Sequence, residues 1–182
     1  MKNQIMIAAV LCAAGSLLFP KQSLGQSTNP DIPIPKSVTI DPSLSAADKQ
    51  KMMHAGQLFY AFWNTGNEKY LREAVSANFF DNTLPKGRPQ GYKGILFASA
   101  NFRKAVPDLK CSVEDLIITK DKITCRQIYT GHNTGPLGDH KASGKAVNFF
   151  AIDILHVRDG KVFEDWHLED NLTFLQEIGI VK

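Results

Sequence analysis

The apolar positions of residues 45–106 recur at the spacing of helices. Ser45 and Asp48 fit a capping box, and the segment that follows them keeps its apolar side chains on one face up to Gly66. Similar but shorter patterns span residues 68–77 and 92–106. Three helices are therefore predicted, the first of them long. Its aromatic side chains are predicted to pack in the core rather than to contact a ligand.

Beyond Leu109 the apolar positions alternate as they do in strands. The pattern predicts four strands and a short C-terminal helix, over residues 111–119, 122–130, 146–157, 161–169 and 171–178. The glycine-containing connection 131–145 is predicted to be a flexible loop of the kind that often gates a site. Helices followed by a meander of strands indicate the α+β class.

Residues 1–25 are predicted to be a signal peptide. The apolar run 5–19 follows a basic start and is shorter than a membrane-spanning helix. Ser23 and Gly25 fit a cleavage rule with the cut before Gln26. An uncleaved membrane anchor is the alternative. We therefore expect an exported protein, either periplasmic or extracellular.

Composition divides the rest of the chain into two parts. Residues 26–44 are rich in Pro, Ser, Asn and Asp and are predicted to be a flexible linker, and residues 45–182 are predicted to form one folded domain. The net charge is +3, without a long basic run or a basic stripe with interleaved aromatic residues. This composition argues against a nucleic-acid partner and favours small molecules.

The two cysteines outside the signal peptide, Cys111 and Cys125, are expected to be buried thiols. Export would permit a disulfide. However, a tight turn near residues 120–122 pairs Cys125 with the neighbourhood of Leu116, about five residues from Cys111 along the ladder. That separation exceeds the reach of a disulfide.

Asp153 is the polar residue that most needs an explanation. It lies between Ile152 and Ile154 in the strand 146–157, which is apolar on both faces apart from a few positions. A carboxylate in such a strand is costly unless it is paired or functional.

The turn after this strand decides what Asp153 faces. A three-residue loop within residues 157–161, closed by a left-handed glycine, places Asp153 opposite Asp165 and diagonal to His167. A two-residue turn would place Trp166 opposite Asp153 instead. The three-residue loop is the preferred interpretation.

On the preferred register, one face of the sheet combines apolar walls with two acids and a histidine. Its members are Val147, Phe149, Ala151, Asp153, Leu155, Phe163, Asp165 and His167. Burial and the neighbouring carboxylate should raise the pKa of the acid, and such an acid–base pair can remove a proton next to a carbonyl without a cofactor. A buried Asp–His bond that only joins two strands is an equally open interpretation.

Other chemistries have weaker support in the sequence. A metal site would have to bring His132 and His140 to the same cluster, and no pair of candidate ligands has a recognisable spacing. No glycine-rich phosphate loop follows a strand, and there is no Gly-x-Ser-x-Gly motif. Nucleotide use and serine hydrolysis are therefore not predicted.

Several short motifs, in this order and spacing, resemble the SnoaL-like polyketide cyclase or ester cyclase family of the nuclear-transport-factor-2-like (NTF2-like) superfamily. They span residues 58–66, 106–109, 130–132, 142–145 and 159–166. The resemblance implies a cone-shaped NTF2-like (cystatin-like) fold, with three N-terminal helices packed on a curved antiparallel sheet and a short C-terminal helix. It also implies an apolar cavity and neither metal nor cofactor.

The resemblance also bears on the site. Cyclases of this family close a ring by aldol chemistry, with a cavity Asp as general acid/base beside a His. An ungapped alignment brings the family's Asp onto His167 and its His onto Asp153, whereas a slip of two residues brings the Asp onto Asp165. Asp81 and Asn82 fall where the family often has a polar pocket residue.

The predicted function is a cofactor-independent enzyme of the cyclase or isomerase type, acting on a small apolar carbonyl or ester compound. Asp153, His167 and Asp165 are its expected catalytic group, and the expected substrate-binding residues are Tyr60, Trp63, Asp81, Asn82, Phe149 and Phe163. The alternative is a non-catalytic periplasmic binding or accessory protein that uses the same cavity. The outer sheet face, with Phe150, Ile152, Ile154, Trp166 and Leu168, is expected to form a homodimer.

Overall fold

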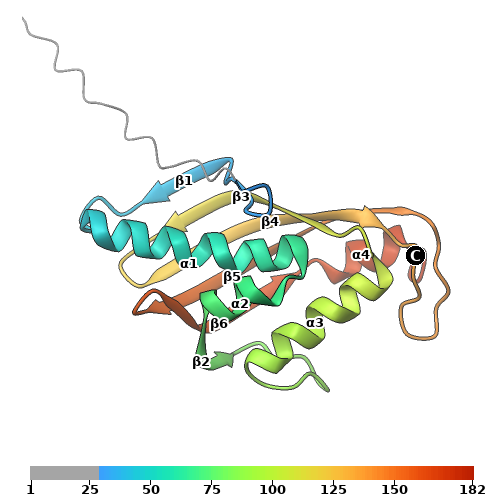
Figure 1. Cartoon of the computed structure of the whole chain (residues 1–182). Helices are drawn as coiled ribbons and strands as arrows, with labels where there is room; N and C mark the ends of the chain where they lie inside the picture. Colours follow the sequence, from blue (N-terminus) through green and yellow to red (C-terminus); the bar gives the residue numbers. More distant parts are fainter. Residues whose placement is uncertain (1–28) are drawn as a thin grey trace, which may run out of the picture.

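The computed structural model describes residues 29–182 as a mixed α+β fold, so the expected signal peptide lies outside the described residues. Its elements in chain order are β1 (Ser37–Ile40), α1 (Ala46–Thr65), α2 (Glu68–Ala74), β2 (Val75–Asp81), α3 (Tyr92–Ala105), β3 (Lys110–Ile118), β4 (Lys122–His132), β5 (Ala146–Arg158), β6 (Lys161–Glu169) and α4 (Asn171–Glu177) (Figure 1). Within this part of the chain, no helix is long and apolar enough to cross a membrane.

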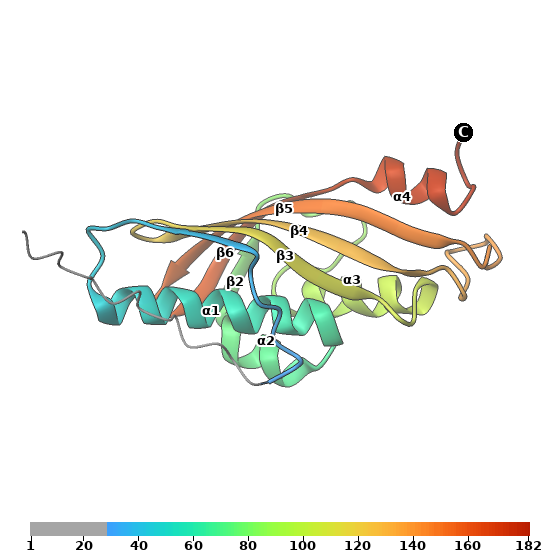
Figure 2. The same cartoon turned by 90° about the horizontal axis from the view of Figure 1, so that it is seen from above.

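The six strands form one sheet in the order β1-β3-β4-β5-β6-β2. The central meander from β3 to β6 is antiparallel, but the two edge strands pair in parallel, β1 with β3 and β2 with β6. The expectation of a wholly antiparallel sheet is therefore wrong at both edges. Helices α1, α2 and α3 lie on the same side of the curved sheet (Figure 2), which gives the molecule an inner and an outer sheet face.

Part of the segment predicted to be a flexible linker belongs to the fold. Ser37–Ile40 forms β1, and just before it the backbone N–H of Lys36 donates to the carbonyl of Val113 at 3.0 Å. Further upstream, the hydroxyl of Tyr70 donates to Asp31 Oδ2 at 2.8 Å. The prolines lie outside β1, which leaves its backbone donors free for pairing. Composition alone could not distinguish an edge strand from a linker here.

The strand β2 was not predicted. The second helix ends at Ala74, three residues before its expected end, and the chain continues directly as β2. The burial of β2 does not alternate strictly, and its pairing with β6 shifts register between Val75 and Phe80. An irregular edge strand of this kind lacks the period-two pattern on which sequence reading depends.

The long first helix was predicted correctly, with both of its ends. The Asp48 backbone N–H donates to Ser45 Oγ at 3.1 Å, as in a capping box. At the other end, Gly66 is left-handed, with a φ of 73°, and its N–H donates to the Phe62 carbonyl. The helix packs against β3 with its aromatic face buried.

The predicted pairing of the two cysteine-bearing strands is confirmed. Leu116 pairs with Cys125, and both Cys111 and Cys125 are buried free thiols.

The turn between β5 and β6 differs from the preferred prediction. Arg158 pairs with Lys161 across a two-residue turn, in which Asp159 and Gly160 have φ angles of 52° and 74°. Two consecutive positive φ angles match a type I′ turn, which suits the twist of the strands. A β-bulge next to the turn, between His156 and Val157 in the ladder, then adds one residue to the count along β6.

The bulge changes which residues face each other at the centre of the sheet. Asp153 lies directly opposite His167, and Asp165 lies opposite Leu155. Neither the three-residue loop nor a plain two-residue turn gives this register, because a bulge shifts the pairing by one more residue. The bulge itself could not be read from the sequence.

The connection 131–145 was expected to be a flexible gating loop. Its first two residues belong to the end of β4, and the remaining loop 133–145 is hydrogen-bonded to the end of α3. The buried Asn133 donates to the carbonyls of Ala105 and Gly135 at 3.0 and 2.9 Å, and accepts from the backbone N–H and hydroxyl of Ser143 at 2.9 and 3.0 Å. No residue of the loop lines the cavity described below.

At Gly94 the backbone of α3 lies directly against the loop that precedes the helix, with no room for a side chain. A Cβ at Gly94 would lie 2.0 Å from the carbonyl oxygen of Pro89. Gly94→Ala should therefore displace the loop and lower the free energy of unfolding by about 1–3 kcal/mol in chemical denaturation. The matched control is Gly56→Ala in α1, where the nearest atom is the flexible Ile123 Cδ1 at 3.3 Å. That control should be close to neutral, and equal losses in both variants would contradict the explanation.

Candidate active site

A cavity lies between the inner face of the sheet and the helices. It holds about 370 Å³ of space, including its open mouth. Its lining combines apolar and ionisable side chains, namely Phe59, Trp63, Phe79, Asp81, Arg88, Ile95, Gln127, Tyr129, Ala151, Asp153, Asp165, His167 and Glu169. Apolar walls with a few convergent polar groups are typical of a small-molecule site.

Asp153 is the buried acid at the centre of the cavity. Two donors hold one of its oxygens: Tyr60 Oη lies 3.1 Å and Gln127 Nε2 lies 2.8 Å from Oδ2. Burial raises the pKa of Asp153 to about 7, although the nearby positive charge of His167 works in the opposite direction. Asp153 can therefore exchange its proton near neutral pH.

His167 lies between two other carboxylates. Its Nε2 is 3.1 and 3.2 Å from the two oxygens of Asp81, and its Nδ1 is 2.9 Å from Glu169 Oε1. The contact to Glu169 is an ion pair in which the imidazolium and the carboxylate are both largely buried. Burial alone would lower the pKa of His167, but Glu169 and the other carboxylates outweigh it and raise the pKa to about 9. His167 is therefore a cation at neutral pH.

Asp165 is a third buried acid, with 6% of its surface exposed. Its Oδ1 has no hydrogen-bond partner in the described part of the chain. Burial, and then the proximity of Asp153, raise the pKa of Asp165 well above its ordinary value. This shift favours the protonated form of Asp165, which can donate a hydrogen bond.

The structure brings most of the predicted site residues together. Trp63 and Asp81 line the cavity, and Tyr60 reaches it through its hydrogen bond to Asp153. Phe149 lines an adjoining apolar hollow, which shares Trp63 with the main cavity.

Two predicted substrate-binding residues lie elsewhere. Phe163 lies on the outer sheet face, where its ring is 4.5 Å from that of His156 and the Arg158 guanidinium lies over it. The bulge turns Phe163 away from the cavity, so its assignment is wrong. Asn82 does not line the cavity: it is exposed, and its backbone N–H donates to the Asp165 carbonyl at 2.9 Å.

Gln127, Glu169 and Arg88 line the cavity but were missed. Gln127 had a readable signal, because it is a polar residue at an inward position of an alternating strand. Glu169 had another, since it follows His167 by two residues and so shares its face. Arg88 comes from the loop between β2 and α3, where no periodic pattern points to a site.

The remaining histidines named in the metal interpretation do not reach this cluster. His132 is exposed, and its Nδ1 lies 2.7 Å from Asp108 Oδ2. His140 is an exposed residue of the loop 133–145. Among residues 29–182 there is no group of three or more His, Cys, Asp and Glu residues with the geometry to hold a metal ion.

Comparison with known proteins points to one family. A family model described as SnoaL-like polyketide cyclase matches residues 54–178. The chain is 52% identical to a candidate polyketide cyclase from Bacillus cereus ATCC 10987, with a TM-score of 0.77 over 85% of this chain and 97% of that one. A comparison with curated proteins found no match.

More distant structures share the fold. TsrD from Streptomyces laurentii is 25% identical, with a TM-score of 0.64 over 76% of this chain and 100% of that one. A protein of ketosteroid isomerase-like fold from Catenulispora acidiphila DSM 44928 is 16% identical, with a TM-score of 0.56 over 69% of this chain and 92% of that one. The mixed sheet with helices on its inner face is consistent with the NTF2-like and ketosteroid isomerase-like folds.

Proposed function

Because the chain belongs to the SnoaL-like polyketide cyclase family, we propose that it is a cofactor-independent enzyme of the cyclase or isomerase type. Its substrate would be a small, mostly apolar carbonyl or ester compound. The observation that carries the proposal is Asp153, a buried acid in the cavity that titrates near neutral pH and lies opposite the cationic His167. Groups tuned in this way are typical of proton-transfer sites.

In the proposed reaction Asp153 is the base. Both of its hydrogen-bond donors hold Oδ2, which leaves Oδ1 to take a proton from the carbon next to the substrate carbonyl. The C–H bonding electrons then move to form an enolate, and its negative oxygen can accept a hydrogen bond from the protonated form of Asp165, which the raised pKa of this acid favours. The nearby charge of His167 stabilises the enolate further. Return of the proton to a different carbon of the conjugated enolate completes an isomerisation. Attack of the enolate carbon on a second carbonyl of the same molecule forms a C–C bond, and transfer of the proton from Asp153 to the resulting alkoxide completes a ring closure.

The exchange of Asp and His relative to the family is compatible with this mechanism. Asp153 and His167 occupy directly paired positions on β5 and β6. Exchanging the residues of such a pair between the two strands keeps both side chains on the same face of the sheet. The acid–base pair would therefore survive, although each member approaches the substrate from the other strand.

A deuterium-exchange screen tests the proposal. The purified protein is incubated in D₂O with a panel of apolar ketones and esters, and incorporation of deuterium next to the carbonyl is followed by NMR. We expect catalysed exchange for at least one class of compound, with a rate that rises as the pH passes through about 7. If none of the panel exchanges, and a compound retained from the native host is recovered unchanged, the cavity belongs to a binding protein instead.

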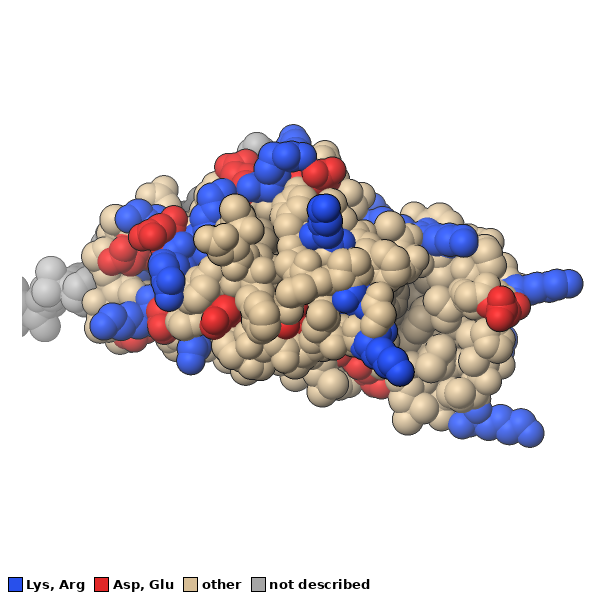
Figure 3. All heavy atoms as spheres, turned by 90° about the horizontal axis from the view of Figure 1, so that it is seen from below, with Lys and Arg blue, Asp and Glu red and all other residues tan. Residues whose placement is uncertain are grey.

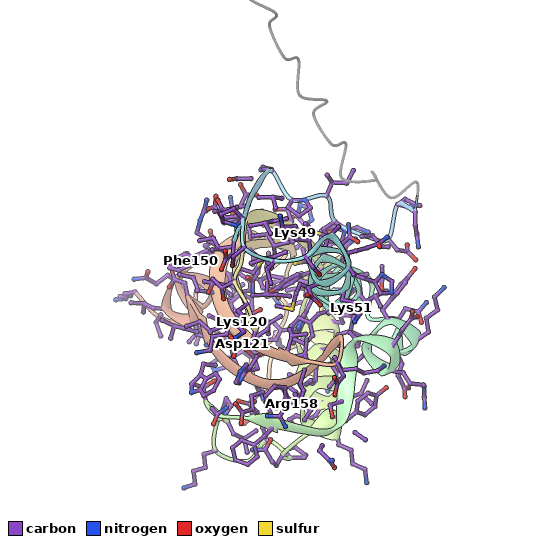
Figure 4. The ribbon with its side chains drawn as sticks, turned by 90° about the vertical axis from the view of Figure 1, so that its left-hand side faces the viewer. Lys49, Lys51, Lys120, Asp121, Phe150 and Arg158 are labelled. Atoms are coloured by element: carbon purple, nitrogen blue, oxygen red, sulfur yellow. The ribbon has the colours of Figure 1, made fainter. Side chains whose placement is uncertain are left out.

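We also propose that the outer sheet face forms a homodimer. Phe150, Ile152, Ile154, Trp166 and Leu168 are exposed there, and Figure 4, which looks along the sheet from the end with Lys120 and Asp121, shows Phe150 on the side away from α1. Light scattering should give the mass of a dimer. Ile154→Glu should shift it to that of a monomer, because a buried unpaired charge disrupts an apolar interface. A wild-type monomer would contradict the proposal, and Ile34→Glu, at an exposed position before β1, is the control.

A further inference from the structure

The cavity holds more acidic than basic groups. Four carboxyl groups line it, those of Asp81, Asp153, Asp165 and Glu169, and the cationic side chains are Arg88 and His167. The chain as a whole carries a net charge of +3, and charges of both signs are interspersed at the margins of the face shown in Figure 3. The acidic excess is therefore a local property of the cavity.

Two buried acceptors in the cavity have no donor from the described residues. Gln127 is 1% exposed, and its Oε1 is unpaired because its amide nitrogen is turned toward Asp153. The second acceptor is Asp165 Oδ1. An unpaired buried polar atom costs about 1–3 kcal/mol, so both sites favour a bound molecule that brings N–H or O–H donors.

The apolar walls of the cavity are mostly aromatic. Phe59, Trp63, Phe79 and Tyr129 all contribute, and the rings of Trp63 and Tyr129 meet edge to face with their centroids 6.2 Å apart. Aromatic faces attract cations, most strongly in sites shielded from water. The cavity therefore favours a compact cation with several hydrogen-bond donors, because it combines aromatic walls, an excess of carboxyl groups and unpaired acceptors.

We infer that the cavity binds an alkylammonium group, and that the substrate is a carbonyl compound with a basic amino substituent. The carbonyl part of this statement rests on the proposed function. An ammonium group offers three N–H donors, which suit Gln127 Oε1 and Asp165 Oδ1, and its charge offsets the excess of carboxyl groups. A neutral alcohol would satisfy one acceptor at most.

Binding of a cation should release protons from the cavity. Burial raises the pKa of both Asp153 and Asp165, and the proximity of Asp153 raises that of Asp165 further, whereas an incoming cation favours the ionised forms of both acids. The titratable and charged groups that face these two acids are Tyr60 from α1, Asp81 from β2, Arg88 from the loop before α3, Cys111 from β3, Cys125 and Tyr129 from β4, and His167 and Glu169 from β6. Affinity for the cation should therefore increase with pH until Asp153 is ionised.

The test uses Trp63 as an internal probe. The chain has two tryptophans, and Trp166 lies on the outer sheet face, so a Trp166→Phe protein reports on the cavity alone. Its fluorescence is titrated with n-butylammonium chloride and, in parallel, with n-butanol. We expect the Kd of the amine to fall at least fivefold between pH 6 and pH 8, and the Kd of the alcohol to stay constant. At pH 8 the amine should bind at least tenfold more tightly than the alcohol.

A second variant tests the residues named. Asp165→Asn should weaken amine binding at least fivefold, whereas Asp115→Asn, on the exposed part of β3, should leave it unchanged. Circular dichroism verifies that each variant folds. If Asp165→Asn is unfolded, the pH dependence of the Trp166→Phe protein decides the matter.

Equal affinities for the amine and the alcohol, or a Kd of the amine that does not change with pH, would overturn the inference. These outcomes are separable from a failure of the proposed function, because binding is measured without turnover. Deuterium exchange of simple ketones in a protein that does not bind amines would refute the amino substituent alone. Amine binding without exchange of any carbonyl compound would instead refute the proposed enzyme.

Discussion

Replacing Asp153 by Asn is expected to lower the rate of catalysed proton exchange by roughly 10²–10⁴-fold, the usual contribution of a positioned general base. The amide keeps the shape of the carboxylate. Its oxygen can occupy the place of Oδ2 and keep the hydrogen bonds from Tyr60 and Gln127, so the cavity should remain intact. The amide cannot take a proton, and this is the property that the variant removes. The measurement is deuterium incorporation into an accepted carbonyl compound, compared with wild type at pH 8.

The same substitution makes a distinct prediction for stability. The raised pKa of Asp153 means that, between its ordinary pKa of 3.8 and its folded value of about 7, the folded protein binds a proton that the unfolded chain has released. The contribution of Asp153 to the wild-type free energy of unfolding should therefore decrease across this range and level off above it. Asp153→Asn should flatten this part of the profile and be as stable as wild type, or more so, at pH 8. A large loss of stability at pH 8 would show that Asp153 is a structural partner instead of a base.

The control for Asp153 is Asp159→Asn. Asp159 lies in the turn between β5 and β6 with a φ of 52°, a conformation that Asn adopts readily. This change should affect neither the exchange rate nor the slope of stability against pH. A comparable loss of exchange in both variants would show that Asp153 is not specifically required.

Replacing His167 by Gln is expected to reduce both stability and activity. At neutral pH the imidazolium lies between Asp81 and Glu169, and its removal leaves two poorly exposed carboxylates without their shared cation. Breaking a buried ion pair by removing one partner costs about 3–5 kcal/mol, and the partial exposure of Glu169 places this site near the lower end of that range. The free energy of unfolding at pH 7, measured with urea, tests this value.

The pH dependence of the His167→Gln effect has a definite sign. The pKa of His167 is raised from 6.5 to about 9 on folding, so its stabilising contribution is fully present below pH 6.5 and disappears as the pH rises through 9. The difference from wild type should therefore shrink in alkaline solution. The positive charge of His167 also lowers the pKa of Asp153. Without it, the rise of the exchange rate with pH should move to higher pH, an effect that lost packing alone would not produce.

His156→Gln is a matched control for His167. Like His167, His156 lies between two carboxylates, with Nδ1 3.2 Å from Glu164 and Nε2 2.8 Å from Asp121, but on the outer face of the same two strands. Its side chain is 24% exposed, compared with 8% for His167. The stability loss should therefore be below about 1 kcal/mol, and the exchange rate should not change. If His156→Gln is as damaging as His167→Gln, the effect does not come from the cavity.

Sequence reading found the residues at the centre of the site but not their geometry. Asp153 was recognisable because a carboxylate between isoleucines in an apolar strand demands an explanation. Its partner was uncertain, because the pairing of β5 with β6 depends on a turn and a bulge. The bulge places His167 directly across from Asp153 and turns Phe163 to the outer face. A bulge is a local compromise between twist and packing, and it leaves no periodic signal in the chain.

Residues from outside the meander were the hardest to predict. Asp81 meets His167 because β2 adds to the edge of β6, and Arg88 enters the cavity from a loop. The prediction of a flexible linker over residues 26–44 was wrong at β1 for a related reason. Edge strands pair on one side only, so they need neither the length nor the alternation that marks a central strand.

For Asp153, the sequence and the tertiary structure determine different properties. The sequence alone determined the helices, the central strands, the family resemblance and the presence of a costly buried acid, because local periodicity and burial preferences act over a few neighbouring residues. Only the tertiary structure decided that Tyr60, Gln127 and His167 surround that acid, because they come from α1, β4 and β6 and meet through long-range packing. The same packing raises the pKa of Asp153 to about 7, since desolvation and neighbouring charge depend on distances in space and not on order in the chain.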